Sequence, residues 1–179
     1  MPRKNILDLL KGGDRRSIGR AEQVAASVLK NPGLFRELIA GLRSEDTLVR
    51  MRAGDAAEKV SRTTPGLLQP HKDELLALLA ETGEQELRWH LAAMVPRLSL
   101  NSKERQYTAS LLNRYLEDRS SIVKTSALQG LADLAHSDAA IRAEAIKALR
   151  KAARTGTPAM KARSRKLLHL LEHTECGRP

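Results

Sequence analysis

Apolar residues recur along this chain with the period of an α-helix, and the same pattern occurs four times. In the stretch from Glu84 to Leu98, a basic residue follows Leu87 at offset 1 and apolar residues follow at offsets 4, 8 and 11. These offsets form one stripe on a helix with 3.6 residues per turn. The pattern starts again at Val49, Val123 and Met160, so successive starts lie 38, 36 and 37 residues apart, and its one polar exception is Ser164.

A second set of apolar residues precedes each start. Leu38, Leu76, Leu112 and Leu149 lie 11 residues before it, and Leu42, Ala80, Leu116 and Ala153 lie seven residues before it. Each unit therefore predicts two helices. A single helix pair cannot bury its apolar face alone, whereas stacked pairs share one continuous core. The pattern predicts an all-α fold, an α-solenoid of about four helix pairs.

Capping residues and prolines set the expected boundaries. Asn31-Pro32, Asp46 and Thr157-Pro158 are typical of helix starts. Pro96 is expected to bend or end its helix, and Gly130 to permit a close helix contact. The expected units are about 31–62, 70–98, 102–135 and 138–173. Residues 1–30 fit the pattern poorly and are interpreted as an N-terminal helical cap, 174–179 as a tail, and the whole as one structural domain.

The second helix of each unit resembles the HEAT-repeat family in its bacterial form. The family pattern is similar to D-x-x-V-R-x-x-A-x-x-A-L, which Asp46-Thr-Leu-Val-Arg50-Met-Arg-Ala53 follows well, while Glu86-Leu-Arg88 and Ile122 to Ala127 match in part. The resemblance implies that the Asp and Arg positions tie neighbouring repeats together, so that these residues are structural: Asp46, Arg50, Arg88, Lys124 and Lys161. The family includes scaffolds, regulatory subunits, nucleic-acid-binding proteins and a few enzymes, and site identity does not follow from fold.

The composition indicates which residue types form the core and in which cellular compartment the protein is expected. Aromatic residues are only 2% of the chain, so the core must consist of Leu, Val, Ile and Ala. The single cysteine, Cys176, cannot form a disulfide framework, and no apolar run is long enough for a signal peptide or a membrane span. We therefore expect a cytoplasmic protein that does not bind membranes.

The net charge of +10 is concentrated at the two ends of the chain. Residues 142–166 contain nine basic residues and one acid, and residues 1–20 contain six basic residues and two acids. Such patches attract phosphate backbones, although a solvated end cap that prevents stacking of arrays would look the same. The candidate basic patch consists of Lys147, Arg150, Lys151 and Arg154, which form one helical stripe, together with Arg163 and Lys166.

The inner surface of the second helices is a separate candidate site. A non-enzymatic scaffold that binds a protein partner on this concave face is the first hypothesis, and a nucleic-acid-binding module that uses the basic ends is the alternative. Trp89 is either an interface anchor or packing between units. The candidate partner-binding residues are Arg52, Asp55, Lys59, Trp89, His90, Arg97, Gln129 and Asp133.

Enzymatic readings find little support in the residues. His169-Leu-Leu-Glu172-His173 has the spacing of a zinc-peptidase helix, but only six residues follow it, so a solvated last turn is favoured. Some HEAT-like proteins excise alkylated purines from DNA, which requires aromatic surfaces and a carboxylate, yet Ala93 stands one turn after Trp89. No motif tests the bilin-lyase branch of the family. We therefore expect no catalytic site, no cofactor and no metal. The sequence leaves the oligomeric state open.

Overall fold

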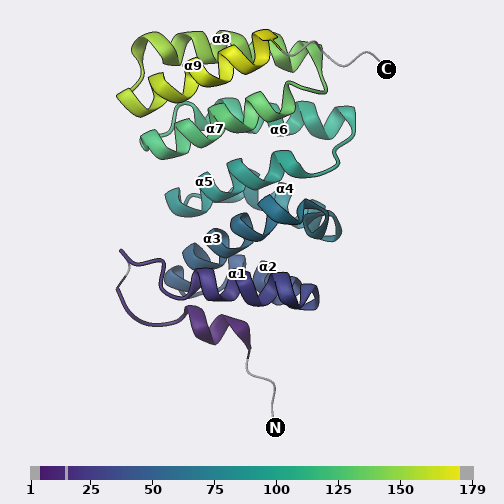
Figure 1. The fold of residues 1–179 in the computed structure, drawn as a ribbon, viewed down its shortest axis with the longest axis vertical. Coiled ribbons are helices and arrows are strands. Elements are labelled where there is room, and N and C mark those ends of the chain that lie inside the picture. The colour runs from purple at the N-terminus through teal and green to yellow at the C-terminus, as the bar shows by residue number, and fades with distance from the viewer. Residues whose placement is uncertain (1–4, 15, 174–179) are drawn as a thin grey trace. The chain divides into compact units, whose positions relative to one another are not determined.

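The described part of the chain, residues 5–14 and 16–173 of the computed structural model, consists of helices joined by short loops, with no strand among these residues (Figure 1). This confirms the all-α prediction. The α-helices are α1 (Ala21–Lys30), α2 (Phe35–Ala40), α3 (Thr47–Thr63), α4 (Lys72–Glu81), α5 (Gln85–Met94), α6 (Ser102–Tyr115), α7 (Ser121–Leu134), α8 (Ala139–Thr155) and α9 (Pro158–His173). Five 3₁₀ segments join them within these residues: Ile6–Leu10, Pro32–Leu34, Gly41–Arg43, Pro65–His71 and Val95–Arg97.

The chain divides into two compact units, Met1–Leu75 and Leu76–Pro179, and the boundary falls inside α4. In the first unit, α1 and α2 pack against α3, and the 3₁₀ segment Ile6–Leu10 packs against the same helix. The core of this unit contains fully buried leucines and valines, among them Leu10, Val24 and Val60. The prediction of one structural domain with an N-terminal cap stays a prediction.

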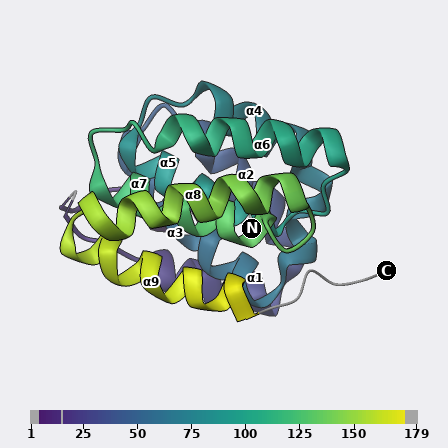
Figure 2. The ribbon, with the colours of Figure 1, turned by 90° about the horizontal axis from the view of Figure 1, so that it is seen from above.

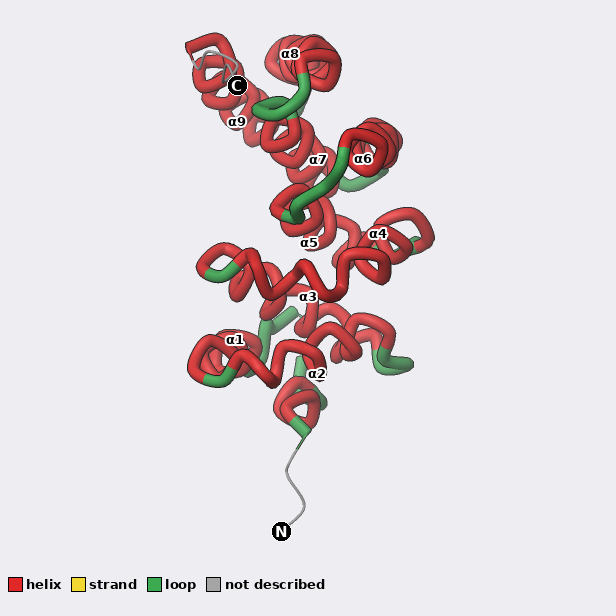
Figure 3. Tube along the Cα trace, turned by 90° about the vertical axis from the view of Figure 1, so that its right-hand side faces the viewer, coloured by secondary structure: helices red, strands yellow, loops and turns green. Residues whose placement is uncertain are grey.

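The second unit contains paired helices in two layers. α7 packs against α5 and α9, while α6 contacts α7 and α8 contacts both α7 and α9. Figure 3 shows α6 and α8 on one side of this unit and α5, α7 and α9 on the other. Figure 2 shows α8 and α9 side by side along most of their length, in agreement with their packing.

The apolar stripe read from the sequence forms the core of both units. The residues at offsets 0, 4, 8 and 11 are buried in all four repeats, except for the half-buried Leu168. On the preceding helices the prediction holds in part, because the predicted positions Leu38, Leu42, Leu112 and Leu149 are buried and Leu76 is half-buried. Leu79, Tyr115 and Ala152, eight residues before the starts, are buried, whereas Ala80, Leu116 and Ala153, the other predicted positions, are half-buried.

The helix boundaries follow from local capping. The Asp46 carboxylate accepts hydrogen bonds from the backbone N–H groups of Leu48 and Val49, which caps α3 as expected. Asn101 and Glu104 form a reciprocal capping box at the start of α6. Pro96 ends α5, because the chain continues as the 3₁₀ segment Val95–Arg97. The starts of α3 at Thr47 and of α9 at Pro158 agree with the helix starts expected at Asp46 and Thr157-Pro158.

Arg88 links two helix pairs of the second unit. Its guanidinium donates to the carbonyl oxygen of Thr82 at 2.8 Å and pairs with the Asp118 carboxylate at 2.6 Å, in the turn after α6. The same guanidinium lies over the Tyr115 ring, 5.3 Å from its centroid, and the Tyr115 hydroxyl donates to the Leu79 carbonyl. The contact has the structural role that the resemblance implied for Arg88. In the first unit, Arg50 donates to the carbonyls of Ser44 and Glu45, within its own repeat.

None of the helices formed by residues 5–14 and 16–173 has both the length and the apolar character that crossing a membrane needs.

Candidate functional site

A cleft of about 780 Å³ opens in the second unit where two helix pairs meet. Its walls come from the end of α6, the start of α7, the C-terminal half of α8 and the start of α9. Leu116, Leu128 and Met160 form part of its apolar floor. The cleft exists because α8 extends past the last turn of α6, so that its C-terminal half faces the loop before α7.

Basic side chains dominate the charged rim of this cleft. Five of them line it, against two carboxylates: Arg119, Lys124, Lys147, Lys151 and Arg154, against Glu117 and Glu144. The Glu144 carboxylate accepts a hydrogen bond from the Asn113 side chain at 3.3 Å. Lys147, Lys151 and Arg154 are exposed and form no ion pair with any residue among 5–14 and 16–173. Their charges are therefore directed into solvent at the mouth of the cleft.

Two helix N-termini contribute further positive potential. Ser121 opens α7 and Pro158 opens α9, and both Ser121 and the cap residue Thr157 line the cleft. The Ser120 and Thr157 hydroxyls each accept from one backbone N–H, which leaves other N–H groups of these first turns without a helical partner. The positive ends of the helix dipoles thus point toward the same space as the lysines.

The predicted basic patch is divided by the structure. Lys147, Lys151 and Arg154 line the cleft, whereas Arg150 turns toward α9 and pairs with Glu172 at 3.2 Å. Arg163 donates to the Gln129 side chain at 2.9 Å, which places it with the inner residues of α7, and Lys166 is exposed on α9. The four basic residues of the predicted stripe on α8 share a helical spacing, yet only three of them line the cleft.

Sequence reasoning missed Arg119 and assigned Lys124 only a structural role. Arg119, in the loop between α6 and α7, and Lys124, in the first turn of α7, line the cleft opposite α8. Because both lie far from Lys147 along the chain, the sequence did not indicate that they share a site with it. The available signal was the stacking of consecutive helix pairs, which brings each inter-helix loop close to the next pair.

Arg52 is a correction to the predicted partner-binding face. It is 2% exposed, and its guanidinium donates to four backbone carbonyls of the N-terminal segment, those of Leu10, Gly12, Asp14 and Ser17, at 2.6–3.2 Å. Gly19, at a φ of +54°, packs against it, and a Cβ there would lie 2.7 Å from the guanidinium carbon. Arg52 therefore holds the N-terminal segment on α3 and presents no surface to a partner.

His90 is a second correction. It is 8% exposed, and its ring packs at 5.3 Å, edge to face, against the ring of Trp89, which is half-buried on α5. Asp55 and Lys59 are half-buried on α3 and form an ion pair at 2.8 Å, and Lys59 also reaches Glu22 of α1. The role of Trp89, Asp55 and Lys59 in partner binding stays a prediction.

The remaining inner residues of the second unit form a polar row on α7 and α9. The Gln129 amide donates a hydrogen bond to the Asp133 carboxylate at 2.8 Å and accepts one from Arg163. Arg97 is half-buried, and its positive charge acts on Asp133. Burial raises the pKa of Asp133, against the opposing effects of the Gln129 hydrogen bond and the positive charges of Arg97, His136 and Arg163. Gln129, Asp133 and Arg163 do not line the cleft.

The other motifs give no catalytic arrangement among the described residues. The rings of His169 and His173 lie 4.2 Å apart, and Nδ1 of His173 is hydrogen-bonded to the carbonyl of His169. Residues 5–14 and 16–173 hold no group of three or more His, Cys, Asp or Glu side chains that could bind a metal, and Cys176 lies outside them. Phe35 packs against His71 and Tyr115 is buried, so Tyr107 is the exposed tyrosine.

Three solved structures share the fold. They are crystal structures of engineered proteins from the Northeast Structural Genomics Consortium, 16%, 15% and 16% identical to this chain, with TM-scores of 0.66, 0.64 and 0.63. The alignments cover 93%, 94% and 95% of this chain and 78%, 80% and 47% of the engineered chains. At this identity the likeness shows the fold alone. Comparison with protein-family profiles and with curated protein sequences gives no match.

Proposed function

We propose that this protein is a short array of HEAT-like helix pairs that binds a nucleic-acid backbone in the cleft between α6–α7 and α8–α9. The observation that carries the proposal is the group of three cationic side chains on α8, Lys147, Lys151 and Arg154, which face a cleft without intramolecular ion pairs. Uncompensated cations around a concavity are what a polyanion requires for binding.

The arrangement suits several phosphates rather than one. Lys147 and Arg154 lie seven residues apart on α8, which is about 10 Å along a helix. Phosphates along one nucleic-acid strand advance by about 3.4 Å of helix axis, so the row covers roughly three of them. Arg119 and Lys124 add positive charge from the opposite wall. The N-termini of α7 and α9 could donate backbone hydrogen bonds to the same phosphates.

The proposal is tested by fluorescence anisotropy with a labelled 20-nucleotide single strand and a 20-base-pair duplex of random sequence at low salt. The variant combines Lys147→Gln, Lys151→Gln and Arg154→Gln, which removes three charges from the cleft. Each lost phosphate contact removes a share of the electrostatic affinity, so we expect binding to weaken about 10-fold or more.

A control variant separates the cleft from net charge. Arg20, Lys30 and Arg36 are exposed in the first unit, and their replacement by Gln lowers the net charge by the same amount. The control is expected to retain most of the affinity. Equal losses in the two variants, or no binding of either probe by the wild-type protein at low salt, would retire the proposed function.

A protein partner on the inner helices of the second unit is the second candidate. It is favoured by the preformed Gln129–Asp133–Arg163 row and by the half-buried Trp89 of α5. A purified partner that stays bound at moderate salt, and is released by Trp89→Ala but not by the cleft variant, would support this function instead.

A further inference from the structure

We propose that the nucleic acid is single-stranded and that Tyr107 on α6 stacks against one of its bases. The inference rests on the proposed function, because the strand backbone is taken to lie in the cleft. Tyr107 is 49% exposed, although aromatic side chains are few in this chain. Its ring lies on the outward face of α6, and its hydroxyl makes no hydrogen bond with residues 5–14 or 16–173.

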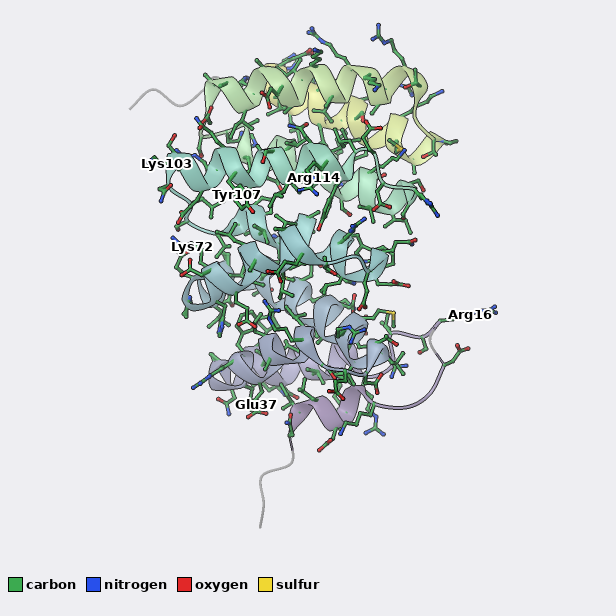
Figure 4. All side chains as sticks on the ribbon, turned by 180° about the vertical axis from the view of Figure 1, so that it is seen from behind. Arg16, Glu37, Lys72, Lys103, Tyr107 and Arg114 are labelled. Atoms are coloured by element: carbon green, nitrogen blue, oxygen red, sulfur yellow. The ribbon has the colours of Figure 1, made fainter. Side chains whose placement is uncertain are left out.

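The residues around Tyr107 form a cationic stripe along α6. Lys103, Tyr107, Ser110 and Arg114 stand at offsets 0, 4, 7 and 11, which place them on one helix face, and all four are exposed. Figure 4 shows Lys103, Tyr107 and Arg114 following one another along this helix. A positive charge on either side of an aromatic ring is the arrangement that binds a backbone while a base stacks.

No carboxylate interrupts this stripe. The acid within α6 is Glu104, whose side chain accepts from the backbone N–H of Asn101 in the capping box at 2.8 Å. Glu104 follows Lys103 by one residue, so it does not lie on the stripe, and its carboxylate is hydrogen-bonded at the start of α6. The stripe therefore carries net positive charge next to an exposed ring.

The stripe ends beside the cleft. Arg114, its last member, lines a second hollow with Arg88 and Tyr115, and Glu117 in the turn after α6 lines both that hollow and the cleft. Tyr107 lies seven residues before Arg114, about 10 Å along the helix, which corresponds to roughly three nucleotides of a stacked strand at about 3.4 Å each. A strand that leaves the cleft would therefore pass the Glu117 carboxylate before it reaches Arg114 and the ring.

Stacking on a protein ring requires an unpaired base. In a duplex both faces of each internal base are covered by its neighbours, so an exposed ring adds affinity only for single strands or frayed ends. Backbone cations act on either form. Tyr107 should therefore discriminate between the two forms, and the cleft lysines should not.

The test compares Tyr107→Ala with wild type on labelled 20-nucleotide oligo(dT) and on a 20-base-pair duplex at low salt. Base stacking is worth about 1–3 kcal/mol per base, so single-strand affinity should fall roughly 5- to 150-fold while duplex affinity changes less than about twofold. Tyr107→Phe, which keeps the ring, should restore single-strand binding. Leu170→Ala on α9, also at a side chain 49% exposed, is the control and should bind like wild type.

The possible outcomes separate the two proposals. Binding of both probes with no selective loss in Tyr107→Ala would overturn the stacking inference and leave the cleft in place. Wild-type binding to the duplex with none to the single strand would also overturn it. Absence of binding to both probes would overturn the proposed function itself. Far-ultraviolet circular dichroism of each variant confirms that a lost affinity does not reflect unfolding.

Discussion

A single arginine holds the N-terminal segment on the first unit. The Arg52 guanidinium donates to four carbonyls at 2.6–3.2 Å, and no carboxylate is needed to neutralise it because the carbonyl dipoles surround it. Gly12 and Gly13, at φ values of +70° and +83°, allow the chain to turn these carbonyls toward one point. The interaction is local in space but spans 35–42 residues of sequence.

Arg52→Met is expected to destabilise the protein by about 3 kcal/mol, because it removes hydrogen bonds from a charged donor and leaves buried carbonyls such as that of Leu10 unsatisfied. Urea unfolding measures the loss, and limited proteolysis should show faster cleavage near residues 10–17. Arg52→Lys should recover only part of the stability, since an ammonium cannot reach four carbonyls in a planar fan. Wild-type stability in Arg52→Met would contradict this role.

The Arg88–Asp118 pair makes stability depend on pH. The Asp118 side chain is 9% exposed, and burial opposes ionisation, but the Ser120 N–H hydrogen bond and the Arg88 guanidinium outweigh it and lower the pKa of Asp118 below its usual 3.8. A depressed pKa gives stability that is complete above the unfolded value. That stability is lost as pH falls from 3.8 through the folded value.

Asp118→Asn should therefore lower the unfolding free energy at pH 7, and the difference from wild type should shrink as pH falls below 3.8. Urea unfolding at pH 7, 5 and 3 checks this. A difference that stays constant with pH would mean that the Asp118 charge contributes nothing and that the variant acts only through packing.

Residue-level roles were the least predictable from sequence. The structural role of Arg88 was implied by the resemblance to the HEAT-repeat family, while its partner Asp118 needed the structure. The role of Arg52 was not indicated, because its four partners are carbonyls of an irregular loop, which leave no mark on a hydrophobic pattern. Nothing in the sequence distinguishes Tyr107 from Phe35 and Tyr115, which are buried, whereas Tyr107 is exposed.

At the scale of elements, helix packing depends on close approach in the second unit. Gly130 lies on α7 where that helix meets α5, and a Cβ there would lie 2.6 Å from the carbonyl oxygen of Ala92 and 3.1 Å from Cγ of Pro96. The position requires glycine for space, since its backbone is helical. The sequence indicated a close contact at Gly130, while the contacting residues needed the structure.

Gly130→Ala should destabilise the protein by about 1–2 kcal/mol, because the backbone oxygen of Ala92 must move and the helix propensity of alanine offsets only about 1 kcal/mol of that cost. Gly83→Ala is the matched control, because a Cβ there meets nothing within 4 Å. Urea unfolding of both variants gives the comparison. Equal stability of Gly130→Ala and Gly83→Ala would contradict the close packing of α7 on α5.

The helices themselves were largely predictable because their stripes and caps are local. The second helices match in register, since an apolar stripe at offsets 0, 4, 8 and 11 faces the core in each repeat. On the first helices the positions 11 residues before the starts are buried in three of the four repeats, as predicted, whereas seven residues before the starts only Leu42 is buried. Leu79 and Tyr115 are buried in place of Ala80 and Leu116.

At the scale of the molecule, charge and shape coincide in the second unit. The basic run of residues 142–166 was evident from composition. The cleft was not, because it forms only when the end of α8 extends over the loop that contains Arg119. The excess charge would be unfavourable through self-repulsion unless an anion binds there, which is the physical basis of the proposed function.

The most direct test of this account is the salt dependence of binding. The dissociation constant of a 20-nucleotide single strand is measured from low to moderate salt for wild type and for the Lys147→Gln, Lys151→Gln, Arg154→Gln variant. The logarithm of affinity should fall linearly with the logarithm of salt, and the variant's slope should be smaller in magnitude by about 2, since each phosphate contact contributes about 0.7. Identical slopes would show that the α8 cations contact no phosphate, and would contradict the account.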